Sequence, residues 1–395
     1  MKILVVAHES EFTGGANRSL MMVIEKLKKQ YNAEIEVLLP KSTGGFNNQL
    51  DELNIKWHYI APYFGVISSI RNDGKDILRF GKVYIGYIIE DIISRFAVNR
   101  FKNKNYDLVY TNTRLTIVGA KIAKELKIPH VCHAREFGAE KPLWGFWDYK
   151  DVYNMSDKII CISEALKSRF EEYTASDKLV TIHNGIDSPL NLECDYDKSE
   201  KNTFDMILTG RIVPDKGQDE AIKAMNILMK KGYRDIKLHI VGSSPKRTHI
   251  KWYETQIKDL VKEYGLKENI FFHGEIQDMV AMRKNMNVEL MCAIRETFGR
   301  VTVEGMRSGL AVIGSNTGGT LEIISNNENG ILYNQGSPDD LADKIEMLYL
   351  DRDMLKRIAK NGYDFSQNHF TPENNVKEIY NVFEEIVQRK KKNEN

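Results

Sequence analysis

The stretch that decides the fold is RETFGRVTVEGMRSGLAVIGSNTGGTLEII, which runs from Arg295 to Ile324. It places Glu296 and Glu304 eight positions apart, and then continues with the apolar run Leu310 to Ile313 and the pair Gly318-Gly319. The pattern predicts one carboxylate in a loop, a second on the helix that follows, then a strand and a glycine turn that opens another helix. Eight residues make about two helical turns, so this layout can set the two acids at opposite ends of one extended ligand.

The two acids are suited to binding hydroxyl groups. A carboxylate accepts paired hydrogen bonds from a vicinal diol, which both a ribose and a hexose display. Because Glu is a common residue, this spacing by itself more often marks an exposed loop acid and an ordinary helix residue. The rest of the chain must decide between the two interpretations.

Short apolar strands alternate with longer helical segments along the chain, which predicts βαβ units and parallel sheets. The predicted strands are Ile3 to Ala7, Ile35 to Leu39, Leu108 to Tyr110, His130 to His133, Lys158 to Ile162, Val180 to His183, Phe204 to Thr209, Ile236 to Val241, Ile270 to Phe272, Val288 to Met291, Leu310 to Ile313 and Ile331 to Tyr333. A chain of 395 residues is too long for one ordinary core and favours two domains. We predict Rossmann-like domains at residues 1–187 and 204–370, a linker at 188–203, and a terminal helix with a basic tail at 371–395.

Composition points to a cytoplasmic globular protein. The chain is 42% hydrophobic and 28% charged, and it has no apolar run long enough to cross a membrane. The first residues lead directly into a strand, so we expect no signal peptide. The four cysteines are scattered, which predicts reduced thiols rather than disulfides or metal ligands: Cys132, Cys161, Cys194 and Cys292. We expect no nucleic-acid partner.

Cations follow the first strand of the second domain. Arg211 and Lys216 flank Pro214, and Gly217 opens the next helix. An Arg fork and a Lys point charge at a helix N-terminus can hold a diphosphate, although two such cations are often merely exposed. In the first domain Gly15 stands between a strand and a helix, where it is either a turn former or a place for an anion to approach the backbone.

Four segments together resemble the retaining, nucleotide-sugar-dependent glycosyltransferases of the GT4 group, of the type used in bacterial capsule and polysaccharide synthesis. They are MKILVVAHESEFTGGANRSL at residues 1–20, HNGID at 183–187, TGRIVPDKGQDEAIKA at 209–224 and the block that contains Glu296 and Glu304. They occur in that family's order and at its usual separations. The resemblance implies the GT-B arrangement: two Rossmann-like domains with parallel sheets facing each other across a cleft, and a terminal helix that crosses back to the first domain.

The resemblance also implies roles for single residues. Glu296 would contact hydroxyls of the transferred sugar, Glu304 the ribose diol, and Arg211 and Lys216 the diphosphate. Further donor contacts are implied for Gly15 and for backbone N–H groups in the segment Phe298, Gly299, Arg300 and Val301. Arg300 departs from the family, where an aliphatic residue is common, and its role stays open.

A histidine that contacts the donor is common in the family at the end of a first-domain strand. Here either His133 or Arg135 can occupy that place, and we favour His133 while noting that a lone strand-end His is often structural.

The expected activity needs no cofactor and no metal. The Asp-x-Asp pairs at Asp195–Asp197 and Asp351–Asp353 lie in the linker and at the start of a surface helix, not on a strand-end loop under a diphosphate. The resemblance implies transfer of a hexose, most simply from a UDP-sugar, to a glycan hydroxyl by front-face substitution. The alternatives are a catalytically silent glycosyltransferase-like subunit and a GT-B epimerase or phosphorylase. The missing G-x-G-x-x-G fingerprint disfavours a dehydrogenase.

The segment Arg71 to Asn105 has twice as many basic as acidic residues, interleaved with aromatic and aliphatic ones. The spacing predicts an amphipathic helix. Two interpretations remain open: a helix packed on its own sheet, or a surface that contacts anionic lipid or a lipid-linked glycan acceptor at the inner face of the membrane.

Overall fold

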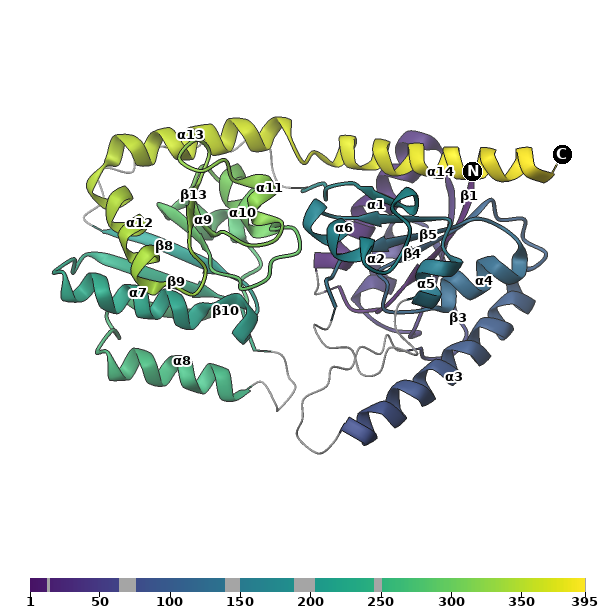
Figure 1. The fold of residues 1–395 in the computed structure, drawn as a ribbon, viewed down its shortest axis with the longest axis horizontal. Helices are drawn as coiled ribbons and strands as arrows, with labels where there is room; N and C mark the ends of the chain where they lie inside the picture. The colour runs from purple at the N-terminus through teal and green to yellow at the C-terminus, as the bar shows by residue number, and fades with distance from the viewer. Residues whose placement is uncertain (13–14, 64–75, 139–149, 188–202, 245–250, 395) are drawn as a thin grey trace. The chain divides into compact units, whose positions relative to one another are not determined.

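A computed structural model describes residues 1–12, 15–63, 76–138, 150–187, 203–244 and 251–394. The chain divides into two compact units, the first formed by residues 1–185 and 372–395 and the second by 186–371 (Figure 1). All but one residue of the predicted linker, and Cys194 with it, lie outside the described residues. The other three cysteines are free and buried.

The first unit is a parallel sheet covered by helices on both faces. Its strands lie in the order β3-β2-β1-β4-β5-β6-β7. The elements are β1 (Lys2–Ala7), α1 (Gly15–Tyr31), β2 (Glu34–Leu39), α2 (Gly45–Glu52), β3 (Lys56–Tyr59), α3 (Asp76–Phe101), β4 (Leu108–Asn112), α4 (Val118–Leu126), β5 (His130–Ala134), α5 (Lys150–Met155), β6 (Lys158–Cys161), α6 (Glu164–Glu171), a 3-10 turn (Ser176–Lys178), β7 (Leu179–Thr181) and α14 (Pro372–Glu394). The sequence analysis missed β3.

Helix α14 completes the core of the first unit. Its residues Val376, Ile379 and Phe383 are buried in one cluster with Leu20 and Ile24 of α1. The rings of Tyr31 and Tyr380 stack between the two helices, with their centroids 4.0 Å apart. The last helix of the chain therefore packs on the first.

The second unit repeats the same plan with six parallel strands in the order β10-β9-β8-β11-β12-β13. The elements are β8 (Phe204–Thr209), a 3-10 turn (Pro214–Lys216), α7 (Gln218–Lys230), β9 (Ile236–Val241), α8 (Lys251–Glu263), β10 (Ile270–Gly274), α9 (Met279–Lys284), β11 (Val288–Met291), α10 (Arg300–Arg307), β12 (Ala311–Ser315), α11 (Thr320–Ile323), β13 (Ile331–Tyr333), α12 (Pro338–Leu350) and α13 (Arg352–Asn368). The predicted fold class, two parallel-sheet α/β domains, is confirmed.

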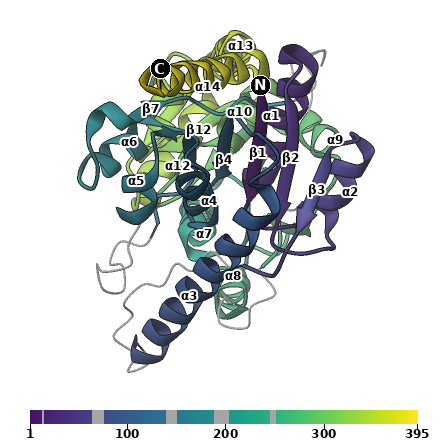
Figure 2. The ribbon, with the colours of Figure 1, turned by 90° about the vertical axis from the view of Figure 1, so that its right-hand side faces the viewer.

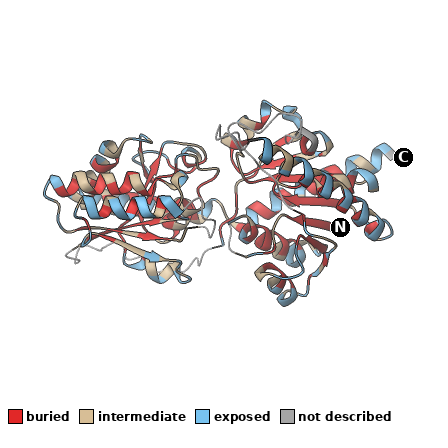
Figure 3. Ribbon diagram, turned by 90° about the horizontal axis from the view of Figure 1, so that it is seen from below, coloured by how far each residue is buried: buried red, intermediate tan, exposed pale blue. Residues whose placement is uncertain are grey.

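Burial follows the layers of each unit. The strands are mostly buried, while the helices turn one face inward and the other to solvent (Figure 3). Helix α3 differs from this pattern, because much of its N-terminal half extends beyond the sheet of the first unit (Figure 2). No helix in the described part of the chain is long and apolar enough to span a membrane.

Candidate active site

Three loops of the second unit start at neighbouring strand ends. They follow β8, β11 and β12, which are adjacent in the sheet, and each leads toward a helix. In a parallel α/β sheet the carboxyl ends of the strands form the usual ligand-binding edge. The predicted residues Arg211, Lys216, Glu296 and Glu304 all lie on these loops or on the first helix behind them.

Lys216 and Glu296 form an ion pair across two of the loops. The Lys216 Nζ donates to Glu296 Oε2 at 2.5 Å, and both side chains are partly exposed. Lys216 ends the 3-10 turn Pro214–Lys216, and Gly217 follows with φ +67°. A Cβ on Gly217 would lie 2.0 Å from the Cys292 carbonyl oxygen, so a glycine is required for the two loops to approach.

The loop that carries Glu296 is shaped by the glycine pair after β12. The Gly319 N–H donates to the Glu296 carbonyl at 2.9 Å. A Cβ on Gly318 would lie 2.1 Å from that carbonyl oxygen, and one on Gly319 would lie 2.6 Å from Phe298 Cα. The Phe298 ring is buried and packs edge-on against Phe370, with centroids 5.4 Å apart. Phe298 therefore anchors the loop with its ring and offers a ligand only its backbone.

Glu304 lies on α10 between two arginines. Its Oε2 accepts from Arg283 Nη2 at 3.3 Å, and its Oε1 lies 3.4 Å from Arg300 Nη2. Gly299 precedes α10 with φ +104°, a left-handed conformation that glycine adopts without strain. The first N–H groups of a helix, here those of Arg300 and Val301, lack intrahelical acceptors and favour anions.

Arg211 is exposed, and within the described ranges no carboxylate pairs with it. A second group of polar residues, centred on Arg135, lies in the first unit at the ends of β4 and β5. Arg135 is 8% exposed; its Nε donates to Asn112 Oδ1 and its Nη1 to Asn184 Oδ1, both at 2.6 Å. Asn184 belongs to the HNGID segment, and its contact with Arg135 was not predicted.

His133 is fully buried within β5. The Tyr110 hydroxyl lies 2.5 Å from its Nδ1, and Arg135 Nη2 lies 3.3 Å from the same atom. Burial, and then the charge of Arg135, hold the pKa of His133 well below its usual value. The histidine is therefore neutral and packed against Arg135, which lies nearer to the surface.

The sequence analysis named no role for His8, which follows β1. Burial, with the nearby charge of Arg135, lowers the pKa of His8 to about 4. Its Nδ1 is buried and has no hydrogen-bond partner among the described residues. Gly15 begins α1 and is exposed. His8 could have been found from its strand-end position, because that position is shared with the other candidates.

Helix α3 combines a buried face with an exposed apolar one. Ile93, Ala97 and Phe101 are buried against the sheet of the first unit. Away from that buried face the helix exposes eight large apolar side chains that follow one stripe: Ile77, Leu78, Tyr84, Ile85, Ile88, Ile89, Ile92 and Phe96. Both interpretations of this segment thus have a physical basis in the same helix; residues 71–75 lie outside the described part.

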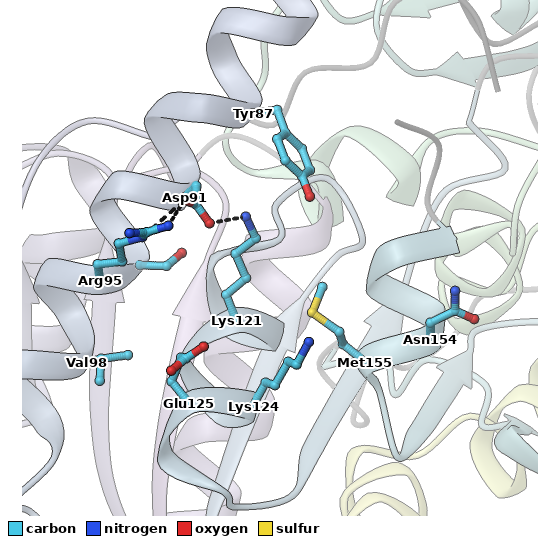
Figure 4. Close-up of a pocket in the computed structure, with 10 residues that line it drawn as sticks. Tyr87, Asp91, Arg95, Val98, Lys121, Lys124, Glu125, Asn154 and Met155 are labelled. Atoms are coloured by element: carbon cyan, nitrogen blue, oxygen red, sulfur yellow. Dashed lines mark hydrogen bonds and ion pairs between the residues drawn. The ribbon is translucent and has the colours of Figure 1, made fainter. Parts of the chain in front are cut away.

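A pocket of about 690 Å³ lies between α3, α4 and α5 (Figure 4). Tyr87 and Asp91 line it from α3, and Lys121 and Lys124 from α4. Lys121 pairs with Asp91 at 2.5 Å and lies over the Tyr87 ring. Cations and an aromatic ring therefore line a pocket formed by the same helix that carries the exposed stripe.

No group of three or more His, Cys, Asp or Glu side chains in the described ranges is arranged to hold a metal. Asp351 is the N-cap of α13, and its side chain accepts from Met354 N at 2.8 Å. The Asp195–Asp197 pair lies outside the described residues.

The chain thus forms two parallel α/β units, one of which has cations and carboxylates on adjoining strand-end loops, the usual ligand-binding edge of such a sheet. Family models match both halves: "Glycosyltransferase Family 4" over residues 13–188 and "Glycosyl transferases group 1" over 196–365. The chain belongs to these glycosyltransferases, as its sequence motifs predicted, and it is a transferase enzyme with the GT-B fold.

Similar proteins include the capsular polysaccharide biosynthesis glycosyltransferase CapM of Staphylococcus aureus, 30% identical over 57% of this chain and 61% of CapM. Another similar protein is a Campylobacter jejuni N-acetylgalactosaminyltransferase that is named for a glycan linked to undecaprenyl diphosphate. It is 21% identical over 91% of this chain and 94% of its own length. Among solved structures, Anabaena Alr3699/HepE in complex with UDP has a TM-score of 0.79 at 21% identity, covering 98% of this chain and 100% of that one.

Proposed function

We propose that this glycosyltransferase moves a hexose from a UDP-sugar to a hydroxyl of a lipid-linked glycan with retention of configuration and without a metal. The observation that carries the proposal is the Lys216–Glu296 pair, which lies beside the Glu304 helix on adjoining strand-end loops. In the proposal the cations bind the diphosphate, Glu296 the sugar and Glu304 the ribose, which are the three polar parts of a nucleoside diphosphate sugar. The Anabaena relative that binds UDP supports the choice of nucleotide.

In this proposal Lys216, Arg211 and the N–H groups at the start of α10 bind the diphosphate. They stabilise the negative charge that grows on the leaving phosphate as the bond to the sugar breaks. Glu296 orients the sugar through its hydroxyls, and Glu304 holds the ribose. A leaving phosphate oxygen accepts the proton of the incoming hydroxyl on the same face, which retains the configuration. The protein contributes position and charge rather than a nucleophile.

The first unit is proposed to bind the acceptor. The sequence left open whether His133 or Arg135 contacts the donor. We assign that contact to Arg135, and to the buried His133 the role of positioning Arg135. The exposed stripe of α3 is suited to the membrane interface, because apolar side chains insert between lipids while flanking Lys82 and Arg95 attract anionic headgroups. The relative named for an undecaprenyl-linked glycan favours such an acceptor.

The first test is nucleotide release from a panel of UDP-, GDP- and dTDP-sugars, with and without a lipid extract and with and without EDTA. We expect release from a UDP-sugar that requires the extract and resists EDTA. Arg211→Ala and Glu296→Gln should each lower turnover by about 10²- to 10³-fold. Lys360→Ala, which alters an exposed ion pair on α13, serves as the control. Near-normal turnover in both site variants would contradict the assignment.

The same panel separates the alternatives. Epimerisation would change the sugar without releasing nucleotide, and a silent subunit would bind donors without turnover under any condition.

Membrane contact is tested by flotation with phosphatidylcholine vesicles with and without phosphatidylglycerol. Ile85→Ser with Ile88→Ser should reduce flotation, whereas Leu350→Ser, an exposed apolar site on α12, should not. Equal flotation of all three proteins would exclude α3 as the contact.

A further inference from the structure

Arg283 is a buried arginine that the sequence analysis did not single out. It lies on α9 and is 3% exposed. Its Nε donates to Glu289 Oε2 at 2.8 Å, and its Nη2 donates to Glu304 Oε2 at 3.3 Å. One guanidinium thus joins α9, the strand β11 and the helix α10.

Glu289 holds this arginine in place through a buried ion pair. It is fully buried in the middle of β11, and Gly305 of α10 packs against it so closely that a Cβ there would lie 2.8 Å from Glu289 Cβ. Burial raises the pKa of Glu289, and the charge of Arg283 opposes that shift. Removing one partner of a buried ion pair leaves the other charge uncompensated, which is strongly unfavourable. The arginine is therefore held in place whether or not a ligand is present.

Glu304 is the exposed end of this network. Its side chain is 21% exposed, and Arg283 and Arg300 each engage a different carboxylate oxygen. A carboxylate has about four acceptor sites, so two cations restrict its orientation and still leave sites for a ligand. Holding a side chain in its binding geometry beforehand reduces the ordering cost of binding.

We propose that Arg283, anchored by Glu289, is a positioning residue that presets Glu304 for the two hydroxyls of a ribose. The inference rests on the proposed function and narrows it, because a carboxylate fixed for a vicinal diol selects ribonucleoside over 2′-deoxyribonucleoside diphosphates. The donor is then a UDP- or GDP-sugar and not a dTDP-sugar. Arg300 covers the second oxygen from the same helix as Glu304.

The test compares the dissociation constants of UDP and 2′-deoxy-UDP by calorimetry on the full chain, and measures the binding of GDP in the same way. Wild type should bind UDP about 10- to 100-fold more tightly, the value of one or two lost hydrogen bonds at a site built for them. Arg283→Met with Glu289→Met removes the buried pair together, so that no buried charge is left alone. It should keep the thermal midpoint and bring the ratio of the two constants close to one.

Two further variants keep the test decisive. Arg283→Lys retains the charge beside Glu289 but lacks a fork that reaches both carboxylates, so it should fold and lose part of the ratio. Lys258→Ala with Glu254→Ala removes an ion pair elsewhere in the second unit and should leave the ratio unchanged.

The outcomes separate this inference from the proposed function. If wild type distinguishes the two nucleotides and both Arg283 variants distinguish them equally well, Arg283 has no positioning role, although the proposed function stands. Equal binding of UDP and 2′-deoxy-UDP by wild type overturns the diol preference itself. If wild type binds neither UDP nor GDP, the proposed donor class fails and the inference fails with it.

Discussion

Replacing Gly319 by alanine should displace the acidic loop without changing any side chain that is proposed to contact a ligand. Gly319 has φ −65°, so alanine adopts its backbone without strain. The new Cβ would lie 2.6 Å from Phe298 Cα and 2.7 Å from the Thr297 carbonyl oxygen, whereas ordinary contact begins near 3.4 Å. The neighbours are backbone atoms, which cannot rotate away. The Glu296 loop must therefore move by about 0.8 Å relative to the glycine turn.

A displacement near 1 Å at a reacting centre costs about 10²-fold in rate, because the bound geometry no longer matches the transition state. We expect Gly319→Ala to lower kcat by about that factor in nucleotide release from the best donor of the panel. Gly81→Ala is the matched control, since a Cβ at that position on α3 meets nothing within 4 Å. Turnover of Gly319→Ala within twofold of wild type, with an unchanged thermal midpoint, would refute this account of the loop.

Three further predictions concern stability. Arg307 is 1% exposed and donates to the carbonyl oxygens of Ile186 and Ser366. Arg307→Met should therefore lower the free energy of unfolding, measured in urea, by about 3–5 kcal/mol. The control Arg357→Ala, at an exposed position, should change it by less than about 0.5 kcal/mol. Burial raises the pKa of Glu90 from 4.5 to about 8, so the folded state binds this proton more tightly than the unfolded state. The free energy of unfolding should therefore fall as the pH rises from 4.5 to 8. Glu90→Gln should flatten that decline. Burial opposes ionisation of Glu36, but hydrogen bonds from Lys104 and other donors lower its pKa from 4.5 to about 2. Its contribution to folding stability should therefore be present above pH 4.5 and be lost as the pH falls to 2. Glu36→Gln should not show this loss.

The strands of the second unit were predictable because each is mainly apolar, as a doubly covered parallel sheet requires, even where a single residue such as Asp205 or Glu289 interrupts the run. Strand β3 was not, because its residues KWHY are largely polar and it lies at the sheet edge. Its one buried side chain, His58, is accommodated by a hydrogen bond to Glu36, a contact that depends on the neighbouring strand. Periodicity within four residues contains no information about such a partner.

The site shows the same limit at the level of single residues. Lys216 and Glu296 were each predicted from local motifs, but their contact joins residues 80 positions apart and depends on three glycine-shaped loops. Arg283 was missed because an arginine on a short helix is ordinarily expected to be exposed to solvent. It became recognisable only when Glu289, an acid in the middle of an apolar strand, was found facing it.

The two carboxylates of the second-unit site are already paired with cations before a donor binds. Glu296 is paired with Lys216, and Glu304 with two arginines, while Arg211 has no carboxylate partner within the described ranges. Under the proposed assignment an incoming diphosphate first meets Arg211 and the start of α10, and then competes with Glu296 for Lys216. Each Lys216 contact given to phosphate frees a Glu296 oxygen for a sugar hydroxyl, so diphosphate and sugar recognition are coupled through one ion pair. In Lys216→Met the Glu296 carboxylate is free from the start, so UDP should bind more weakly and should no longer raise the affinity for a free hexose, as we expect it to do in wild type. An equal effect of UDP on hexose affinity in the two proteins would argue against that coupling.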